Sequence, residues 1–227
     1  MTIPICILGT DTEIGKTYTC CQILEYLNSL GQSAIGLKPI ASGVELTEHG
    51  YLNGDVYSLW QRNRPVIDFE DINPFLFQLP IAPHIAAELE GFDLNVKTLT
   101  SVVNPIINNY STCKHILIEG VGGIMVPLND KETYLDLLKA WQFPVILVVG
   151  MRLGCLNHAL LSYQVLLQHG ILVAGWVANQ LTPDMDYYNA NLEYLTKTFQ
   201  APLIASIPFA GTIQPTPEFD LLFKSNL

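Results

Sequence analysis

The chain has 227 residues, of which 49% are hydrophobic and 14% charged, and its formal net charge is −10. This composition predicts a folded chain with a sizeable core and excludes a disordered one, which combines low hydrophobicity with high charge. The acidic balance argues against nucleic acid and against a membrane surface as partners, because Lys and Arg clusters bind both.

The sequence also indicates the cellular compartment of the protein. Residues 153–183 carry no Asp, Glu, Lys or Arg, but their unbroken apolar run, 170–178, is far shorter than the roughly 18 residues of a membrane span. No basic region with a cleavage pattern follows Met1. The five cysteines, odd in number and without a CxxC pair, predict neither a disulfide framework nor a zinc site. We therefore expect a cytoplasmic protein.

Short apolar segments bounded by turn residues recur along the chain, at residues 3–8, 34–37, 116–118, 145–149, 173–178 and 203–207. Segments that are apolar on both faces are typical of parallel strands covered on both sides. Helical patterns lie between them, at about 15–30 and 156–169, and each ends at a glycine. The alternation predicts an α/β fold with a doubly wound, mostly parallel sheet flanked by helices.

Residues 41–113 form a long segment with turn signals at Asn73-Pro74 and between Pro80 and Pro83. We interpret the segment as an elaborated connection over the top of the sheet. The chain, 1–227, is accordingly expected to form a single domain.

The segment after the first strand, residues 9–17, reads GTDTEIGKT and is followed by the first helix. In such a strand, loop and helix, backbone N–H groups face an anion, Lys16 reaches phosphate oxygens and the Thr17 hydroxyl meets Mg²⁺. Five residues rather than four separate Gly9 from Gly15, so the spacing departs by one from the common phosphate-loop (P-loop) pattern. The alternative is a glycine-bearing turn with a surface lysine.

Three further charged residues join this hypothesis. Lys16 and Lys38 are the only Lys or Arg residues before Arg62, and each follows a strand at the edge where open α/β sheets bind ligands. Lys38 could instead be a solvated strand-end lysine. Glu119 closes a strand and leads into a glycine-rich stretch, where an acid that organises Mg²⁺ is expected. Asp55, by itself, fits a helix N-cap better than a metal ligand.

Taken together, these stretches resemble the dethiobiotin synthase family of the P-loop NTPase superfold, nearly end to end. The segments that carry the resemblance are GTDTEIGKT at 9–17, KPIASG at 38–43, NGD at 53–55, NPF and APH within 73–84, EGVGG at 119–123, PVILVVGMRLGCLNHALL at 144–161, GWVAN at 175–179 and IP at 207–208.

The resemblance implies a role for each matching position. Lys16, Lys38 and Thr12 would be catalytic, and Mg²⁺ would be held by Thr17, Asp55 and Glu119. The nucleotide would be bound by Glu13, Ile14, Gly15, Lys16, Thr17, Tyr18, Glu119, Asn179 and Pro208. The substrate would meet Ser42, Gly122, Gly154, Cys155 and Asn157, although Asn157 could be a simple helix cap.

The implied reaction is the ATP-dependent closure of 7,8-diaminononanoate with CO2 to dethiobiotin, in a homodimer. The family often places a partner tyrosine at the substrate carboxylate, where Asn191 aligns here, close to Tyr187, Tyr188 and Tyr194. The main alternative is a nucleotide-switch ATPase of the partitioning or division type, which carries a second loop lysine where Asp11 stands. An amide-forming ligase of cobalamin synthesis would need a glutaminase domain that this chain has no room for.

Overall fold

The computed structural model describes residues 2–47 and 50–224, and within them the central sheet has seven strands. β10 and β11 are antiparallel, and all the other neighbouring strands are parallel, so the expected mostly parallel sheet is confirmed. In spatial order the strands are β11 (Gln214–Pro215), β10 (Leu203–Ile207), β9 (Val173–Gln180), β8 (Val145–Met151), β1 (Ile5–Gly9), β7 (His115–Glu119) and β2 (Ala34–Leu37).

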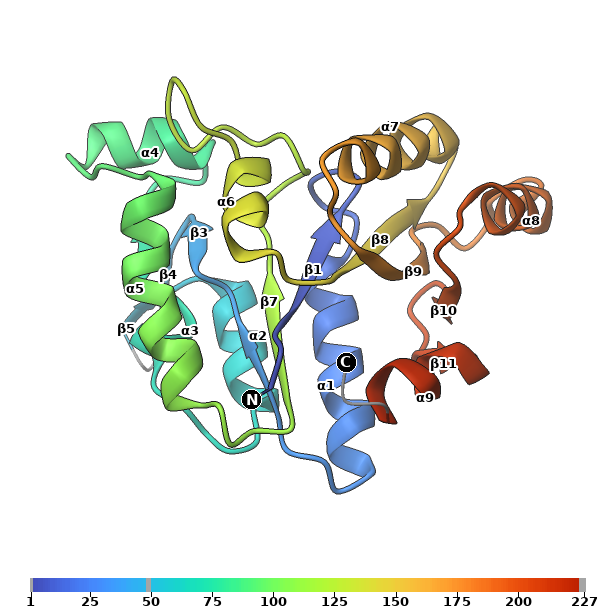
Figure 1. Ribbon diagram of the computed structural model, residues 1–227, viewed down its shortest axis with the longest axis horizontal. Coiled ribbons are helices and arrows are strands. Elements are labelled where there is room, and N and C mark those ends of the chain that lie inside the picture. The colour runs from blue at the N-terminus through green and yellow to red at the C-terminus, as the bar shows by residue number, and fades with distance from the viewer. Residues whose placement is uncertain (1, 48–49, 225–227) are drawn as a thin grey trace.

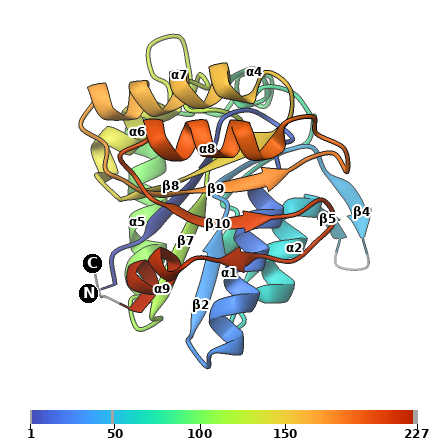
Figure 2. The ribbon, with the colours of Figure 1, turned by 90° about the vertical axis from the view of Figure 1, so that its right-hand side faces the viewer.

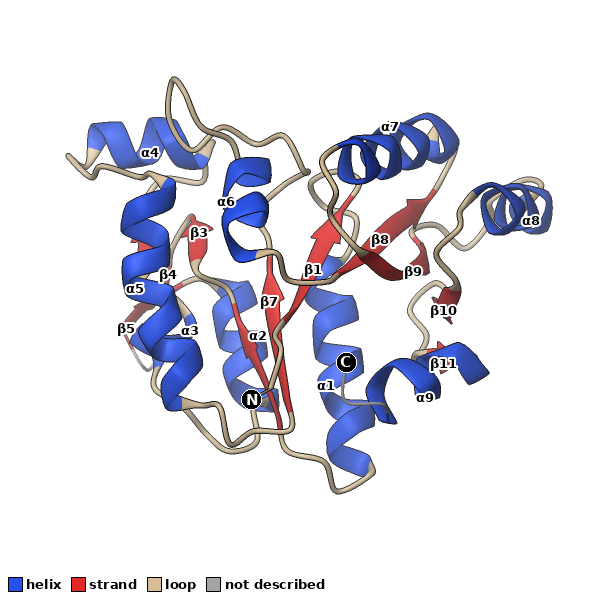
Figure 3. Cartoon of the chain, in the orientation of Figure 1, coloured by secondary structure: helices blue, strands red, loops and turns tan. Residues whose placement is uncertain are grey.

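Helices cover both faces of this sheet (Figures 1 and 3). Figure 2 shows α7 and α8 above strands β8–β10, with α1 and α9 below them. The helices are α1 (Lys16–Ser29), α2 (Gly54–Arg62), α3 (Phe69–Ile72), α4 (Pro83–Leu89), α5 (Val96–Asn109), α6 (Tyr134–Trp141), α7 (Cys155–Gln168), α8 (Tyr188–Thr198) and α9 (Pro217–Lys224). Among the described residues, no helix combines the length and apolar character needed to cross a bilayer.

The core explains why these segments are strands. All seven residues of β8 are buried, as are all five of β1, because helices lie on both sides of them. Ile23, Leu24 and Leu27 are the buried face of α1, which packs against β1, β2 and β7. Burial of this face fixes the helix, and therefore its N-terminus, at the carboxyl end of β1.

The long segment from 41 to 113 is more than a connection over the top of the sheet, and that expectation is corrected here. It builds two small sheets, β3 (Ile40–Ser42) with β6 (Phe75–Phe77) and β4 (Glu45–Thr47) with β5 (Gly50–Leu52). It also supplies α2, which contacts α1 and β2, and α5, which packs on α6. The physical reason is that β2 and β7 are parallel neighbours, and a crossover between parallel strands runs through helices on the sheet face.

Candidate active site

A cavity of about 840 Å³ lies at the carboxyl edge of the sheet, between the loop after β1 and the segment before α4. It brings together most of the residues to which the sequence assigns a role. Its lining comprises Thr12, Glu13, Gly15, Lys16, Thr17, Tyr18, Lys38, Ala41, Ser42, Asn53, Asp55, Pro80, Ile81, Ala82, Pro83, Glu119, Val121, Gly122, Val126 and Pro127.

The loop after β1 forms one end of the cavity. Gly15 has φ 83° and serves as the N-cap of α1, a left-handed conformation that favours glycine. A Cβ at this position would lie 2.2 Å from Nδ2 of Asn179, which donates a 2.8 Å hydrogen bond to the carbonyl of Ile14. Gly15 is therefore required both by the backbone turn and by the close approach of β9.

Lys16 is buried in this loop, and its Nζ donates a 2.8 Å hydrogen bond to the carbonyl oxygen of Asp11. Burial lowers the pKa of Lys16 to about 8, against the opposing effect of the Glu119 carboxylate. The lysine therefore lies along the loop at the N-terminus of α1, where backbone N–H groups can bind a phosphate.

Lys38, Asp55 and Glu119 form a charge cluster in the lining of the cavity, in which Lys38 and Glu119 are buried and the Asp55 side chain is half exposed. The Lys38 ammonium contacts the Asp55 carboxylate and donates a 2.8 Å hydrogen bond to Oε1 of Glu119. Burial lowers the pKa of Lys38, but the Glu119 and Asp55 carboxylates outweigh burial and raise it above its ordinary value. Lys38 is 6% exposed, so its alternative interpretation as a solvated strand-end lysine is wrong.

Asp55 lies in the first turn of α2. Burial raises its pKa, but the Lys38 ammonium and hydrogen bonds from Lys38 and Thr17 outweigh burial and lower it below the ordinary range. The N-cap of α2 is Asn53, whose side chain accepts hydrogen bonds from the backbone N–H groups of Asp55 and Val56. The N-cap interpretation of Asp55 is therefore wrong, because the cap lies two residues earlier and leaves the Asp55 carboxylate free to face the cavity.

The oxygen atoms in this cluster fit a hard divalent cation. Thr17 donates a 2.6 Å hydrogen bond to Oε1 of Glu119, and Oε2 of Glu119 is buried without a hydrogen-bond partner in the described part of the chain. Hydroxyl and carboxylate oxygens are the ligands that Mg²⁺ prefers. Residues 2–47 and 50–224 hold no group of three His, Cys, Asp or Glu side chains suited to a metal. A site with two carboxylates suits Mg²⁺, which keeps waters and substrate phosphates as further ligands.

Another wall of the cavity comes from the end of β3 and the turn before α4. Oγ of Ser42 is buried and lacks a hydrogen-bond partner among the described residues. Pro80, Ala82 and Pro83 line the same wall with apolar surface, and Gly122 faces it. An unpaired buried hydroxyl in a partly apolar wall is suited to an aliphatic substrate with a polar end.

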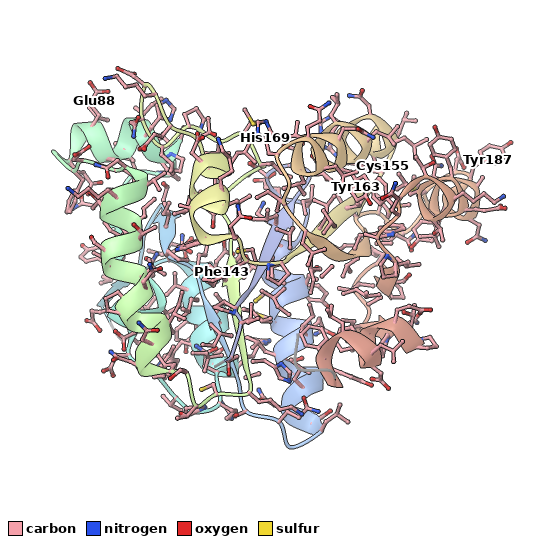
Figure 4. The ribbon with its side chains drawn as sticks, in the orientation of Figure 1. Glu88, Phe143, Cys155, Tyr163, His169 and Tyr187 are labelled. Atoms are coloured by element: carbon pink, nitrogen blue, oxygen red, sulfur yellow. The ribbon has the colours of Figure 1, made fainter. Side chains whose placement is uncertain are left out.

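The remaining predicted substrate residues lie elsewhere. Gly154 and Cys155 line a smaller cavity of about 100 Å³ at the N-terminus of α7, on the other side of Ile14 (Cys155 is labelled in Figure 4). Asn157 is exposed in the first turn of α7 and belongs to the lining of neither cavity as far as the chain is described. Its alternative role as a helix cap is wrong, because Gly154 holds the N-cap position.

The C-terminal segment is attached to α1 beside Tyr18, which lines the cavity. The Tyr18 hydroxyl donates a 2.7 Å hydrogen bond to the carbonyl of Gly211, which in turn donates its N–H to the carbonyl of Pro208. Gln22, one turn further along α1, accepts a 2.9 Å hydrogen bond from the N–H of Ile213. Two side chains of α1 thus hold the segment that contains Pro208 beside the loop.

The chain is similar to known proteins along most of its length. The sequence model of a family described as AAA domain matches residues 4–216. The ATP-dependent dethiobiotin synthetase BioD of Alteromonas mediterranea is 41% identical over 92% of this chain and 93% of its own length. The corresponding protein of Wigglesworthia glossinidia brevipalpis is 39% identical over 89% and 88%. BioD 1 of Escherichia coli K12 is 37% identical over 89% of both chains.

The chain belongs to the ATP-dependent dethiobiotin synthetase family. Solved structures that resemble it more distantly support the fold alone. Chloroplast FtsY from Physcomitrella patens superimposes with a TM-score of 0.56 at 14% identity, covering 98% of this chain and 64% of that one. MinD from Aquifex aeolicus superimposes with a TM-score of 0.54 at 15% identity, covering 97% and 86%. The expected P-loop NTPase-like architecture is confirmed.

Sequence reasoning missed one residue of the large cavity and one ion pair beside the smaller cavity. Asn53 lines the cavity and caps α2, and the signal was present, since Asn before Gly-Asp is a common helix start. Asp11 forms a 2.9 Å ion pair with Arg152, which joins the loop after β1 to the loop before α7. Only the tertiary structure reveals this pair, because 141 positions separate its members.

Proposed function

We propose that this chain is an ATP-dependent dethiobiotin synthetase of biotin biosynthesis. One amine of 7,8-diaminononanoate adds to CO2 to give a carbamate, losing one proton. ATP then phosphorylates the carbamate oxygen and leaves as ADP. The second amine attacks the carbamate carbon, phosphate leaves with the oxygen, and the cyclic urea forms with loss of a proton.

The observation that carries this proposal is the convergence of two buried lysines, Lys16 and Lys38, on one cavity beside Thr17, Asp55 and Glu119. Phosphoryl transfer needs positioning and charge neutralisation more than covalent help from the protein. Lys16 would neutralise the transferring phosphoryl group from the loop side. Lys38 would neutralise it, and the carbamate, from the substrate side.

Thr17, Asp55 and Glu119 would hold Mg²⁺, whose charge on the ATP phosphates lowers the cost of charge that develops on the leaving oxygens. Backbone N–H groups from Glu13 to Thr17 would cradle the phosphates, with Thr12 beside the reacting oxygens. Ile14, Tyr18, Asn179 and Pro208 would flank the nucleoside. Support for that side comes from the hydrogen bond between Asn179 and Ile14 and from the contact of Tyr18 with the segment after Pro208.

Ser42 and Gly122 would face the diamine, supported by the unpaired buried Ser42 hydroxyl. Gly154, Cys155 and Asn157 lie at the N-terminus of α7 and do not line the large cavity, so we assign their contact with the substrate carboxylate to the cavity of the partner subunit in a homodimer. Exposed apolar side chains support such an interface: Leu153 is 99% exposed and Leu161 60% exposed. Tyr187, at the outer edge of the molecule beside α8, is 84% exposed (Figure 4).

The chain would act as one P-loop NTPase-like domain in the cytoplasm on small molecules, without nucleic acid or a membrane. A continuous core and five free, buried cysteines are consistent with these proposals. So is the net charge of −10.

The test is a reaction with Mg²⁺, ATP, bicarbonate and the diamine, followed by mass spectrometry. We expect a product heavier than the diamine by CO less two hydrogens, with one ADP per ring and little ADP when the diamine is omitted. A nucleotide-switch ATPase would hydrolyse ATP regardless of the diamine. ATP hydrolysis without the cyclic product would overturn the proposal.

A further inference from the structure

Asn53 connects two walls of the active-site cavity. Its Nδ2 donates hydrogen bonds to the carbonyls of Ser42, at 3.3 Å, and Gly43, at 2.8 Å. Its Oδ1 accepts from the backbone N–H groups of Asp55, at 3.1 Å, and Val56, at 3.4 Å. One amide therefore joins the end of β3 to the first turn of α2.

Each end of this bridge leads to a group with an assigned role. On the β3 side, Ser42 lines the cavity with its hydroxyl buried in the wall, and Gly43 packs so closely on Pro80 that a Cβ would lie 3.0 Å from the Pro80 Cβ. On the α2 side, the bridge holds the backbone of Asp55, whose carboxylate meets the Lys38 ammonium. A shift of β3 by a bound substrate would therefore be transmitted to the Asp55 carboxylate.

We propose that Asn53 is a positioning residue that couples the diamine wall of the cavity to the metal-binding carboxylate of Asp55. The inference rests on the proposed function for the identity of both ligands. Because coupling between two sites is reciprocal, diamine should tighten the binding of the magnesium nucleotide, and the nucleotide should tighten the binding of diamine by the same factor.

The two functions of the Asn53 side chain can be separated by substitution. Asn53→Ser keeps an oxygen that caps a helix well but removes both amide donors to β3. Asn53→Asp also keeps a capping oxygen, but it places a carboxylate against the carbonyls of Ser42 and Gly43. Asn95→Ser is a matched control, because Asn95 caps α5 through a 2.8 Å hydrogen bond from the Thr98 N–H.

The first measurement is binding, by calorimetry, of a non-hydrolysable ATP analogue as a function of Mg²⁺, with and without 7,8-diaminononanoate. For Asn53→Ser we expect a three- to tenfold higher Mg²⁺ requirement and a loss of most of the tightening by diamine, a size typical of one or two net hydrogen bonds. Asn53→Asp should show a larger loss, and Asn95→Ser should match the wild type.

The second measurement is thermal unfolding of the three variants, which separates positioning from stability. Asn53→Ser should lower the melting temperature somewhat more than Asn95→Ser, because both keep a capping oxygen but only Asn53→Ser loses hydrogen bonds to β3, and binding is compared at a temperature at which both variants are folded. If Asn53→Ser binds Mg²⁺ and nucleotide as the wild type does while the wild type makes the cyclic product, the inference is wrong and the proposed function stands. If the wild type makes no such product, the proposed function fails, and the Mg²⁺ titration without diamine still decides whether Asn53 positions Asp55.

Discussion

The Nζ of Lys38 donates a 2.8 Å hydrogen bond to Oε1 of Glu119, although the two residues lie 81 positions apart in the chain. They meet because β2 and β7 are parallel neighbours, so the residue after one strand and the last residue of the other reach the same edge of the sheet. Both side chains are buried, and removing one member of a buried pair leaves an uncompensated charge. The activity of variants in this cluster must therefore be compared with their stability to unfolding.

Substitution of either buried lysine, Lys16 or Lys38, should slow turnover strongly. Lys16→Ala and Lys38→Ala are each expected to lower kcat at least tenfold, because each removes a positive charge from the transferring phosphoryl group. Lys16→Ala should also weaken nucleotide binding. Lys139→Ala, which breaks an exposed ion pair with Asp136, is the control and should retain wild-type rates. Near-normal rates for Lys16→Ala and Lys38→Ala at saturating ATP would contradict the assignment.

Substitution of the proposed metal ligands should change how activity depends on the Mg²⁺ concentration. Asp55→Asn and Glu119→Gln are expected to raise the Mg²⁺ concentration for half-maximal activity about tenfold, since a neutral oxygen binds a hard cation less well. Glu193→Gln, at an exposed pair on α8, serves as control. Because Asn53 is the cap of α2, Asp55→Asn should not lose the capping hydrogen bonds. An unchanged Mg²⁺ titration in both variants would remove these residues from the metal site.

Tyr18 should affect nucleotide affinity through the C-terminal segment. Tyr18→Phe keeps the ring but loses the hydrogen bond to Gly211, so KM for ATP should rise about threefold to tenfold with little change in kcat. Tyr26→Phe is the matched control on the same helix, where the ring packs against Phe219. Equal KM values in wild type and Tyr18→Phe would show that this contact is not used in binding.

The proposed dimer can be tested by placing a charge on its apolar surface. Leu161→Glu on α7 should shift the particle from twice the monomer mass to the monomer mass in light scattering at micromolar concentration, because an interface core excludes unpaired charge. Leu89→Glu, on α4 and 66% exposed, should leave the particle mass unchanged. A monomeric wild type would contradict the dimer directly.

Acid stability should depend on His115. Burial, with a smaller effect from Lys114, lowers the pKa of His115 to about 4 from 6.5. Between those values the unfolded chain binds the proton and the folded one does not, so this group favours unfolding as pH falls from 6.5 to 4. Denaturant titrations of His115→Gln should show a shallower loss of stability in that window, by less than the limiting value of about 1.4 kcal/mol per pH unit, because the half-exposed ring is screened by water. Parallel curves would contradict a half-buried His115 that stays neutral in the folded protein.

Much of the fold was predictable because strands buried on both faces leave apolar runs. The predicted segments 34–37 and 203–207 coincide with β2 and β10 to the residue. The phosphate-binding loop was equally visible, since its glycine, lysine and threonine are contiguous. What escaped prediction depends on contacts between distant segments. The carbonyls that Asn53 binds and the Gly211 carbonyl that Tyr18 binds carry no sequence signal, because any residue has a carbonyl.

The strand order has a consequence for synthesis of the chain on the ribosome. β1 lies between β7 and β8, pairing Ile5 with Leu117 and Cys6 with Val145. A nascent chain therefore carries this fully apolar strand without either neighbour until more than half of the polypeptide has been made. The phosphate-binding loop reaches its final conformation later still, because Asn179 of β9 donates a hydrogen bond to it. Nucleotide can thus stabilise the fold only after β9 has been made, and until its neighbours are made β1 is an unpaired apolar segment that is prone to aggregation.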